Sequence, residues 1–173
     1  MKIIQANVSH VAVIAELAKT IWADAYKDIL SQNQLHYMLD KFYNNQALIE
    51  QIENKKHIFL LVQENDTFIA FASYQLNCLE PKQHVSLMHK TKVHKIYVLP
   101  SQQGSGIGFK LIQEIEKKAK LAKNCALFLN VNRFNKAQYF YKKLGFEVQY
   151  QENIEIGNGY LMEDFVMEKK LLY

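Results

Sequence analysis

The chain has 173 residues, of which 49% are hydrophobic and 22% are charged. This size and composition are typical of one folded domain with a substantial core. Lysine and arginine (21) exceed aspartate and glutamate (17) by four, and the excess is scattered along the chain. A solvated surface of mixed charge is therefore favoured over a surface that binds nucleic acid or a membrane.

The sequence indicates a protein of the cytoplasm. No apolar run reaches the length of a transmembrane helix, and the amino terminus lacks the apolar core of a signal peptide. The two cysteines, Cys78 and Cys125, have no CxxC spacing, which argues against a disulfide framework or a zinc site. We therefore expect a reducing compartment and no metal.

The hydrophobic pattern predicts helices and strands in a mixed order. The order is a strand at 3–6, helices from Ser9, from Ser31 and over 46–52, strands at 58–62, 67–79 and 93–99, a helix at 107–122, a strand at 126–131, a helix from Asn135, and strands at 146–156 and 160–168. Residues 79–91, with Pro81, favour a loop. We expect one α/β domain over residues 1–173 with a mixed sheet.

Several local signals mark where these elements begin, end and face. Ser9 is expected to cap the first helix, which would bury a stripe of Ile14, Leu17, Ala18, Ile21 and Ala25. In the short helix, Asn135 and Gln138 have the spacing of a capping box, and Gly145 is a natural terminator. The last strand alternates imperfectly, because Glu163 shares a side with the apolar residues next to it in register.

A glycine-rich turn at residues 103–108 joins the strand that ends at Pro100 to the long helix. Such a junction exposes backbone N–H groups and the positive end of a helix dipole, which favours an anion such as phosphate. It is not a P-loop, because Lys110 is not preceded by glycine or followed by serine or threonine. It is not a dinucleotide fingerprint either, because Gly108 comes one place early and no acidic residue follows at the required distance. A turn without a ligand would not need three alternate glycines.

The turn, Gln-Gly-Ser-Gly-Ile-Gly, matches the pattern Q/R-x-x-G-x-G/A and resembles the coenzyme A loop of the GNAT superfamily of N-acetyltransferases. Two further segments carry the resemblance: the preceding strand over residues 96–100 and the segment 135–146, which ends in Phe-Tyr-x-Lys-x-Gly-Phe. Together they cover roughly residues 93–146 in the family's order and spacing.

The resemblance implies a single GNAT-like domain whose mixed, mostly antiparallel sheet is flanked by helices. It implies that the strand ending at Leu99 splays from the strand at 127–131, and that acetyl-CoA is the cofactor. The residues implied to hold coenzyme A are Ile96, Tyr97, Val98, Gln103, Gly104, Ser105, Gly106, Ile107, Gly108, Asn135 and Tyr141. Backbone amides and the helix dipole neutralise a pyrophosphate without a metal.

Acetyl transfer to an amine requires a neutral amine, a polarised carbonyl and a stabilised thiolate. A backbone N–H near Val98 would polarise the carbonyl. The resemblance implies that Tyr141 is the general acid, although its position on an apolar stripe equally suits a core tyrosine. His94 is the candidate base; many relatives have a glutamate near this place, and a distant carboxylate acting through water is the alternative. Asn135 suits either a helix cap or a cofactor contact.

Trp22 and Tyr26 are the candidate residues for the acceptor, with Tyr37 as further aromatic surface and Asp24 and Asp28 to attract a cationic amine. Core packing and a solvated helix face are the alternatives for these residues. Residues 21–61 more loosely resemble bacterial polyamine-type N-acetyltransferases.

We expect an N-acetyltransferase that acts on a primary amine of a small molecule, with no nucleic-acid or membrane partner. The alternatives are a non-catalytic acyl-CoA-binding module and an N-acetyltransferase that acts on protein or peptide amines. A homodimer is compatible with the resemblance because many relatives pair.

Overall fold

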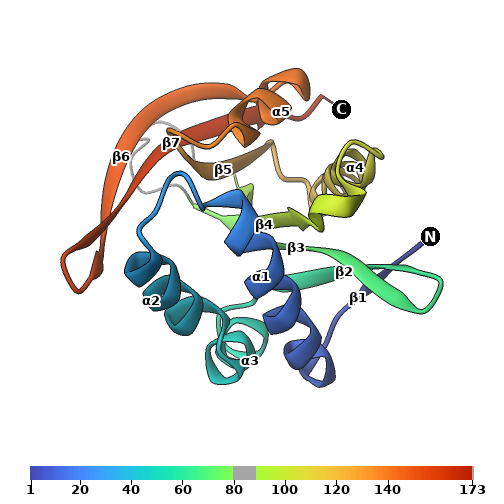
Figure 1. The fold of residues 1–173 in the computed structure, drawn as a ribbon. Helices are drawn as coiled ribbons and strands as arrows, with labels where there is room; N and C mark the ends of the chain where they lie inside the picture. The colour runs from blue at the N-terminus through green and yellow to red at the C-terminus, as the bar shows by residue number, and fades with distance from the viewer. Residues whose placement is uncertain (80–88, 173) are drawn as a thin grey trace. The chain divides into compact units, whose positions relative to one another are not determined.

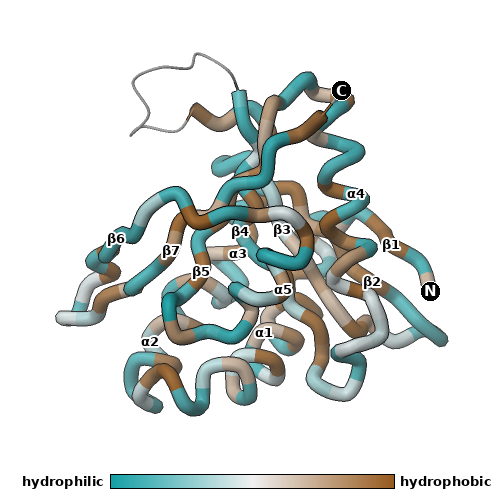
Figure 2. Tube along the Cα trace, turned by 90° about the horizontal axis from the view of Figure 1, so that it is seen from above, coloured by the Kyte–Doolittle hydropathy of each residue, from teal (hydrophilic) through white to brown (hydrophobic). Residues whose placement is uncertain are grey.

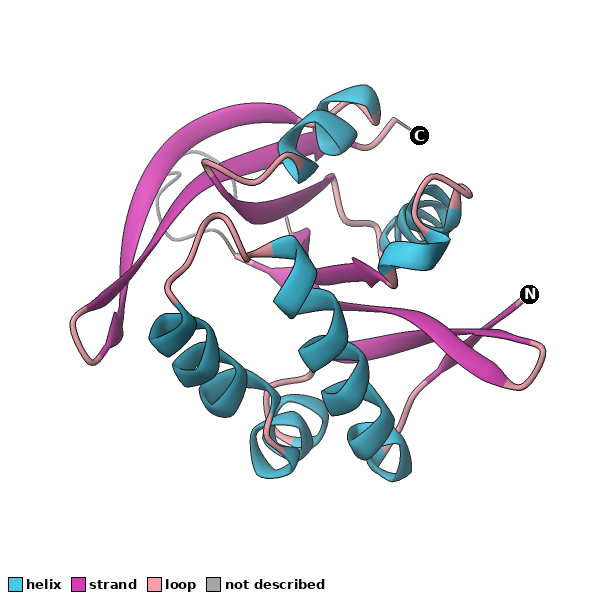
Figure 3. Cartoon of the chain, in the orientation of Figure 1, coloured by secondary structure: helices cyan, strands magenta, loops and turns pink. Residues whose placement is uncertain are grey.

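The computed structural model describes residues 1–79 and 89–172. The helices are α1 (Val11–Ala25), α2 (Gln32–Tyr43), α3 (Asn45–Glu53), α4 (Ile107–Leu121) and α5 (Ala137–Lys143). The strands are β1 (Lys2–Gln5), β2 (Ile58–Glu64), β3 (Thr67–Cys78), β4 (Lys90–Val98), β5 (Ala126–Asn132), β6 (Glu147–Gly157) and β7 (Tyr160–Lys170) (Figures 1 and 3).

The strands form a mixed sheet in the order β1-β2-β3-β4-β5-β7-β6. β4 and β5 run parallel, whereas β1 and β2, β2 and β3, β5 and β7, and β6 and β7 pair antiparallel. This mixed, mostly antiparallel sheet with its helices confirms the predicted α/β fold class. The splay of the fourth and fifth strands stays a prediction.

The chain divides into two compact units. Unit 1 comprises Met1–Tyr74 and Lys95–Leu111, and unit 2 comprises Gln75–His94 and Ile112–Tyr173. β3, β4 and α4 each contribute residues to both units. The prediction of one N-acetyltransferase domain over residues 1–173 stays a prediction.

Unit 1 contains β1, β2, most of β3 and the first three helices. β2 contains a continuous apolar run from Phe59 to Val62 that is 0–4% exposed. Figure 2 colours the chain by the hydropathy of each residue. α1 buries the predicted apolar stripe except at Ala25, which is half-buried. α2 begins where predicted, because the Ser31 hydroxyl accepts a hydrogen bond from the Gln34 backbone N–H at 3.2 Å.

The predicted cap of the first helix is wrong. The Asn7 side chain, not Ser9, caps a short 3-10 turn, and it accepts a hydrogen bond from the Ser9 backbone N–H at 3.0 Å. α1 then begins at Val11 without a side-chain cap. Asn7 is the capping residue because its backbone is extended, as a cap requires, whereas Ser9 already lies inside the turn.

Unit 2 contains the start of β4 and the strands β5, β7 and β6. β4 begins at Lys90, three residues earlier than predicted. Its first two residues are polar yet buried, because Lys90 Nζ pairs with Glu168 Oε2 at 2.5 Å and Thr91 Oγ1 donates to Asn124 Oδ1 at 2.7 Å. The rest of the predicted loop, including Pro81, lies outside the described residues.

The predicted capping box of the short helix is also wrong. α5 begins at Ala137, whose backbone N–H donates to Asn135 Oδ1 at 2.8 Å. The Gln138 side chain turns away and donates to the Arg133 carbonyl at 3.0 Å. Asn135 thus supports the first turn from one side only. Gly145 follows α5 with a φ of 87°, so the predicted left-handed terminator is confirmed.

Candidate functional site

The glycine loop (residues 103–108) lies in unit 1, between the 3-10 turn Pro100–Gln102 and the first turn of α4. Gln103 anchors it, because its backbone N–H donates to the Pro100 carbonyl at 3.3 Å and its side-chain Nε2 donates to the Val98 carbonyl at 3.2 Å. Ser105 Oγ donates to the Gln102 carbonyl at 2.6 Å. These bonds fold the loop back onto the end of β4.

Two of its glycines are required by the backbone. Gly104 and Gly106 have φ angles of 80° and 82°, the left-handed region that other residues rarely adopt. A Cβ at either position would meet no atom within 4 Å. The backbone angle rather than close packing therefore demands glycine, and the space above both residues is open to a ligand.

The backbone N–H groups of residues 104–109 donate no hydrogen bond to any residue that the structure describes. The first hydrogen bond of the helix is donated one residue later, by Lys110 N to the Gly106 carbonyl at 3.1 Å. A row of unpaired amides at the positive end of α4 is suited to an anion with several oxygens. No cluster of three or more potential metal ligands occurs among the described residues.

An aromatic cluster lies beside the same strand in unit 1. The Trp22 ring centroid is 4.6 Å from that of Tyr26 and 5.8 Å from that of Tyr97, and the two tyrosine hydroxyls are 3.3 Å apart. Trp22 is buried, whereas Tyr26 and Tyr97 are half-buried. The structure thus brings the two candidate acceptor residues together with Tyr97, a candidate cofactor residue. Its neighbours on the strand, Ile96 and Val98, are also half-buried.

The acidic and aromatic residues proposed to surround the acceptor differ in their surroundings. Asp24 is exposed and pairs with Lys27 at 2.9 Å. The Tyr37 hydroxyl accepts a hydrogen bond from Lys41 at 3.2 Å. Sequence reasoning missed Tyr43, whose buried ring lies 5.2 Å from that of Trp22. Burial raises the pKa of its hydroxyl well above the ordinary value, so Tyr43 stays protonated.

The candidate acid, Tyr141, lies on α5 in unit 2 and is 8% exposed. Its ring packs against Phe140 and Phe146, at centroid distances of 5.2 and 5.7 Å. The neighbouring Tyr139 is 59% exposed. Tyr141 therefore has the fixed, largely water-excluded environment of a core residue, which also suits a group that must hold a proton until it is needed.

The candidate base, His94, is half-buried on β4, still within unit 2. Its Nε2 lies 3.4 Å from Gln75 Oε1. That contact orients the imidazole ring, and the hydrogen-bond direction depends on its tautomer.

Sequence reasoning also missed Asp164 on β7. This carboxyl group is 2% exposed, and its Oδ2 has no hydrogen-bond partner within the described part of the chain. Burial, and secondly the charge of Glu152, raise its pKa from 3.8 to about 6, while Asn130, Lys92 and Arg133 act in the opposite direction. The available signal was its place between Met162 and Val166, where a charged residue interrupts the buried side of the strand.

Comparison with known proteins identifies the family. The family described as "Acetyltransferase (GNAT) domain" matches residues 55–148, which is more than half of the chain. The chain belongs to the GNAT acetyltransferase family. This confirms the predicted family, the predicted enzyme class and the predicted use of acetyl-CoA.

Solved structures of GNAT proteins share this fold. The PaiA N-acetyltransferase of Thermoplasma acidophilum, solved in complex with coenzyme A, is 25% identical with a TM-score of 0.78, over 98% of both chains. A GCN5-related N-acetyltransferase of Rhodopseudomonas palustris is 19% identical with a TM-score of 0.79, over 98% of this chain and 95% of that one. A ribosomal-protein-alanine N-acetyltransferase of Brucella melitensis is 17% identical with a TM-score of 0.65, over 99% and 100%. In this GNAT acetyltransferase, none of the described helices has the length and apolar character needed to cross a membrane.

Proposed function

We propose that this GNAT acetyltransferase moves the acetyl group of acetyl-CoA directly to a primary amine of a small molecule, such as a polyamine. The observation that carries the proposal is the row of unpaired backbone N–H groups over residues 104–109. Such a row binds a pyrophosphate through its amides and the helix dipole, with no metal.

The cofactor-binding roles follow the predicted pattern. Gly104, Ser105, Gly106, Ile107 and Gly108 hold the pyrophosphate, and the backbone of Ile96, Tyr97 and Val98 holds the pantetheine arm. Gln103 supports the loop rather than the ligand, because its side chain already bonds the Val98 carbonyl. Asn135 contacts the cofactor arm and supports α5 through Ala137 at the same time.

Bound acetyl-CoA would supply the thioester. Residues of this chain accept and donate the protons that move during acetyl transfer. His94 takes a proton from the acceptor ammonium, because only a neutral amine attacks a carbonyl. Tyr141 donates its hydroxyl proton to the departing sulfur. Its contacts with the Phe140 and Phe146 rings restrict the movement of the tyrosine ring that carries this hydroxyl.

Trp22 and Tyr26 bind the acceptor. The half-buried Tyr26 ring presents an aromatic face, and such a face attracts a cation. Trp22 is 4% exposed and acts mainly by holding the Tyr26 ring, 4.6 Å from its own.

The test is release of free thiol from acetyl-CoA with three acceptor classes: aliphatic amines, peptides with a free amino terminus, and no acceptor. We expect turnover with aliphatic amines only. Preference for the peptides would assign a protein acceptor instead, and no turnover with any amine would refute the proposal.

The role of Tyr141 is tested with Tyr141→Phe, using Tyr139→Phe on the same helix as the control. General-acid catalysis contributes about 10²–10⁴-fold, so we expect kcat to fall by about 100-fold for Tyr141→Phe with coenzyme A affinity unchanged. Tyr139 is exposed, and its variant should match the wild type. Equal rates for both variants would remove Tyr141 from the chemistry.

A further inference from the structure

Four aromatic side chains of unit 1 form a cluster that contains polar atoms as well as rings. Its members are Trp22 on α1, Tyr26 directly after that helix, Tyr43 at the end of α2 and Tyr97 on β4. The Trp22 ring centroid lies 4.6, 5.2 and 5.8 Å from those of Tyr26, Tyr43 and Tyr97. All four residues belong to unit 1, as does the glycine loop. The cluster and the loop are therefore parts of one compact unit.

One polar atom of this cluster lacks a hydrogen bond. Trp22 is 4% exposed, and its Nε1 has no hydrogen-bond partner among the residues that the structure describes. The indole N–H is a donor only, so it requires a hydrogen-bond acceptor. A buried donor without one is unfavourable. The Trp22 N–H is therefore suited to an acceptor atom that the described chain does not supply.

The three tyrosine hydroxyls lie near this N–H without accepting its hydrogen bond. Hydrogen-bonding groups of Tyr97 and Trp22 oppose the rise in the pKa of Tyr43, but no hydrogen bond joins the Tyr43 hydroxyl to the indole. The Tyr26 and Tyr97 hydroxyls are 3.3 Å apart, which is longer than the usual distance of about 2.7–2.8 Å between two such oxygens. Both residues are half-buried. The cluster thus reaches the surface through two rings whose mutual contact is weak enough for a ligand atom to replace it.

We propose that the indole N–H of Trp22 donates a hydrogen bond to an uncharged oxygen of the amine substrate, which is then a primary amine that also carries a hydroxyl or amide oxygen. This inference rests on the proposed function and narrows its substrate class. An ammonium group cannot accept this bond, because it has donors only. The neutral amino group cannot accept it either, because its lone pair must attack the thioester. The hydrogen-bond acceptor must therefore be a different atom of the substrate.

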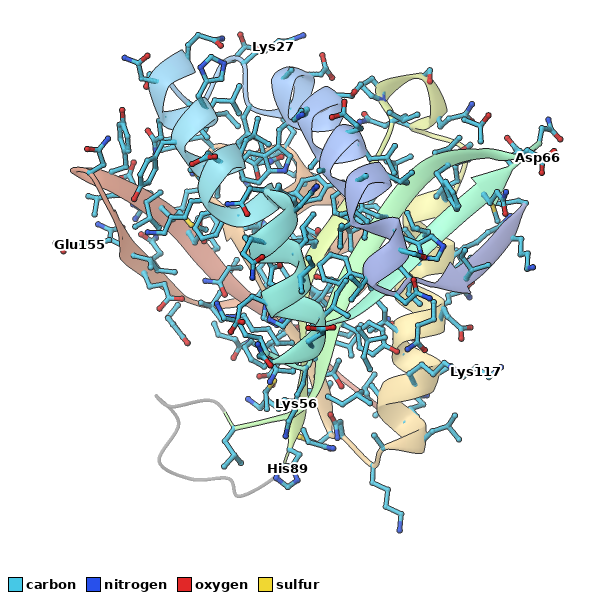
Figure 4. The ribbon with its side chains drawn as sticks, turned by 90° about the horizontal axis from the view of Figure 1, so that it is seen from below. Lys27, Lys56, Asp66, His89, Lys117 and Glu155 are labelled. Carbon is cyan, nitrogen blue, oxygen red and sulfur yellow. The ribbon has the colours of Figure 1, made fainter. Side chains whose placement is uncertain are left out.

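An uncharged oxygen fits the cluster better than a carboxylate does. Indole and phenol groups carry no formal charge at neutral pH, and two lysines close in sequence to the cluster are engaged elsewhere. Lys27 is exposed (Figure 4) and pairs with Asp24 at 2.9 Å. Lys95 donates to Gln51 Oε1 at 2.5 Å. Burying a carboxylate without a cation costs far more than burying a hydroxyl that is hydrogen-bonded.

The experiment uses the full chain and two amines of equal length, 3-aminopropan-1-ol and butylamine, which differ by the exchange of a hydroxyl for a methyl group. β-Alanine is the carboxylate probe. kcat/KM is measured for each amine by thiol release from acetyl-CoA. The variant is Trp22→Phe, which keeps an aromatic ring and removes the N–H; comparing the ratio of the two amines cancels a loss of packing that affects both. The control is Tyr139→Phe, an exposed aromatic residue of unit 2.

Binding is observed separately from turnover. Trp22 is the only tryptophan of the chain, so its indole N–H gives one cross-peak of its kind in a ¹H–¹⁵N spectrum of labelled protein. A new hydrogen bond to an oxygen moves the indole proton downfield. Each amine is added to the wild type with and without coenzyme A, and Tyr43→Phe is recorded without any ligand.

We expect the wild type to prefer 3-aminopropan-1-ol over butylamine about tenfold in kcat/KM, the effect of one hydrogen bond to a buried donor. Trp22→Phe should abolish this preference, and Tyr139→Phe should retain it. The amino alcohol should move the indole cross-peak of the wild type downfield, and butylamine should not.

Equal rates for the two amines in the wild type would overturn the inference, as would a preference that survives in Trp22→Phe or a preference for β-alanine; turnover of these amines would still support the proposed function. A cross-peak that moves with coenzyme A alone and not with the amino alcohol would assign the N–H to the cofactor and overturn it. An upfield shift in ligand-free Tyr43→Phe would also overturn it, because Tyr43 would then already accept the bond. A cross-peak that responds only to the amino alcohol, without any acetylation, would support the oxygen site and refute the proposed function.

Discussion

The buried carboxyl group of Asp164 should make the protein less stable at neutral pH than a variant that cannot ionise there. The perturbation is Asp164→Asn, which keeps the shape of the side chain. In the folded state the pKa of Asp164 is raised from 3.8 to about 6. Burial is the main cause of this rise, and the charge of Glu152 is the second. Lys92, Asn130 and Arg133 oppose this rise, so their effects are already included in the net shift.

The sign of the effect follows from that direction. Because the folded pKa is raised, the folded state holds the proton more tightly than the unfolded chain. The favourable contribution of the protonated Asp164 to the free energy of unfolding is fully present below about pH 4 and is lost as the pH rises through about 6. A shift of about two pKa units corresponds to about 3 kcal/mol. The Asp164→Asn variant does not lose this stability, because asparagine does not ionise.

We therefore expect Asp164→Asn to be more stable than the wild type by up to about 3 kcal/mol at pH 7 and above, and by only about 0.5 kcal/mol at pH 4. The assay is urea unfolding followed by circular dichroism at pH 4, 5, 6, 7 and 8. The difference between the two proteins is compared across pH, so that any pH-independent effect of the substitution cancels. Glu155→Gln is the control, because an exposed substitution changes stability little.

A stability difference that does not change with pH would refute the reasoning, because it would mean that Asp164 has the same pKa in both states. A difference that reverses, with Asp164→Asn less stable at pH 8, would show that the folded protein pairs the carboxylate with a cation.

Two further predictions concern the glycine loop and the start of β4. Gly106→Val should abolish coenzyme A binding in calorimetry, because a branched side chain would enter the open space at a φ of 82°. The control is Gly159→Val, which has a similar φ of 75° and equally open space; it should lower stability by a similar amount and leave binding intact. Equal losses of coenzyme A binding in the two variants would refute the placement of the cofactor at the loop. Lys90→Met should destabilise the protein by about 3–5 kcal/mol in urea unfolding, because it leaves the Glu168 carboxylate buried without its partner. The double variant Lys90→Met with Glu168→Leu should recover most of that loss, and a double variant as unstable as the single one would contradict this account.

The parts of the site that depend on local backbone geometry could be predicted from the sequence. Residues whose backbone must adopt a positive φ, such as Gly106 in the loop and Gly145 after α5, can be recognised from the sequence, because few residues other than glycine adopt that conformation. The preceding strand and the Phe-Tyr-x-Lys-x-Gly-Phe segment are equally local. Through the resemblance to the GNAT superfamily, their order implied the fold and the cofactor without any knowledge of tertiary contacts.

The parts that depend on partners far along the chain could not be predicted. Lys90 and Thr91 are polar and favoured a loop, yet they begin β4 because their partners, Glu168 and Asn124, satisfy them when buried. The position of Ser9 as a cap failed for a smaller reason, since Asn7, two residues earlier, offered a competing side-chain oxygen. Hydrophobic periodicity records burial and cannot record which distant group makes that burial tolerable.

The group formed by Asn130, Glu152 and Asp164 shows the same limit. Asn130, Glu152 and Asp164 meet only because the register of three strands aligns them, and no local pattern encodes that register. In the folded chain the result is a buried carboxyl group, which we expect to reduce stability by about 3 kcal/mol at neutral pH. Proteins commonly retain such unfavourable groups at binding sites, where the ligand supplies the missing partner.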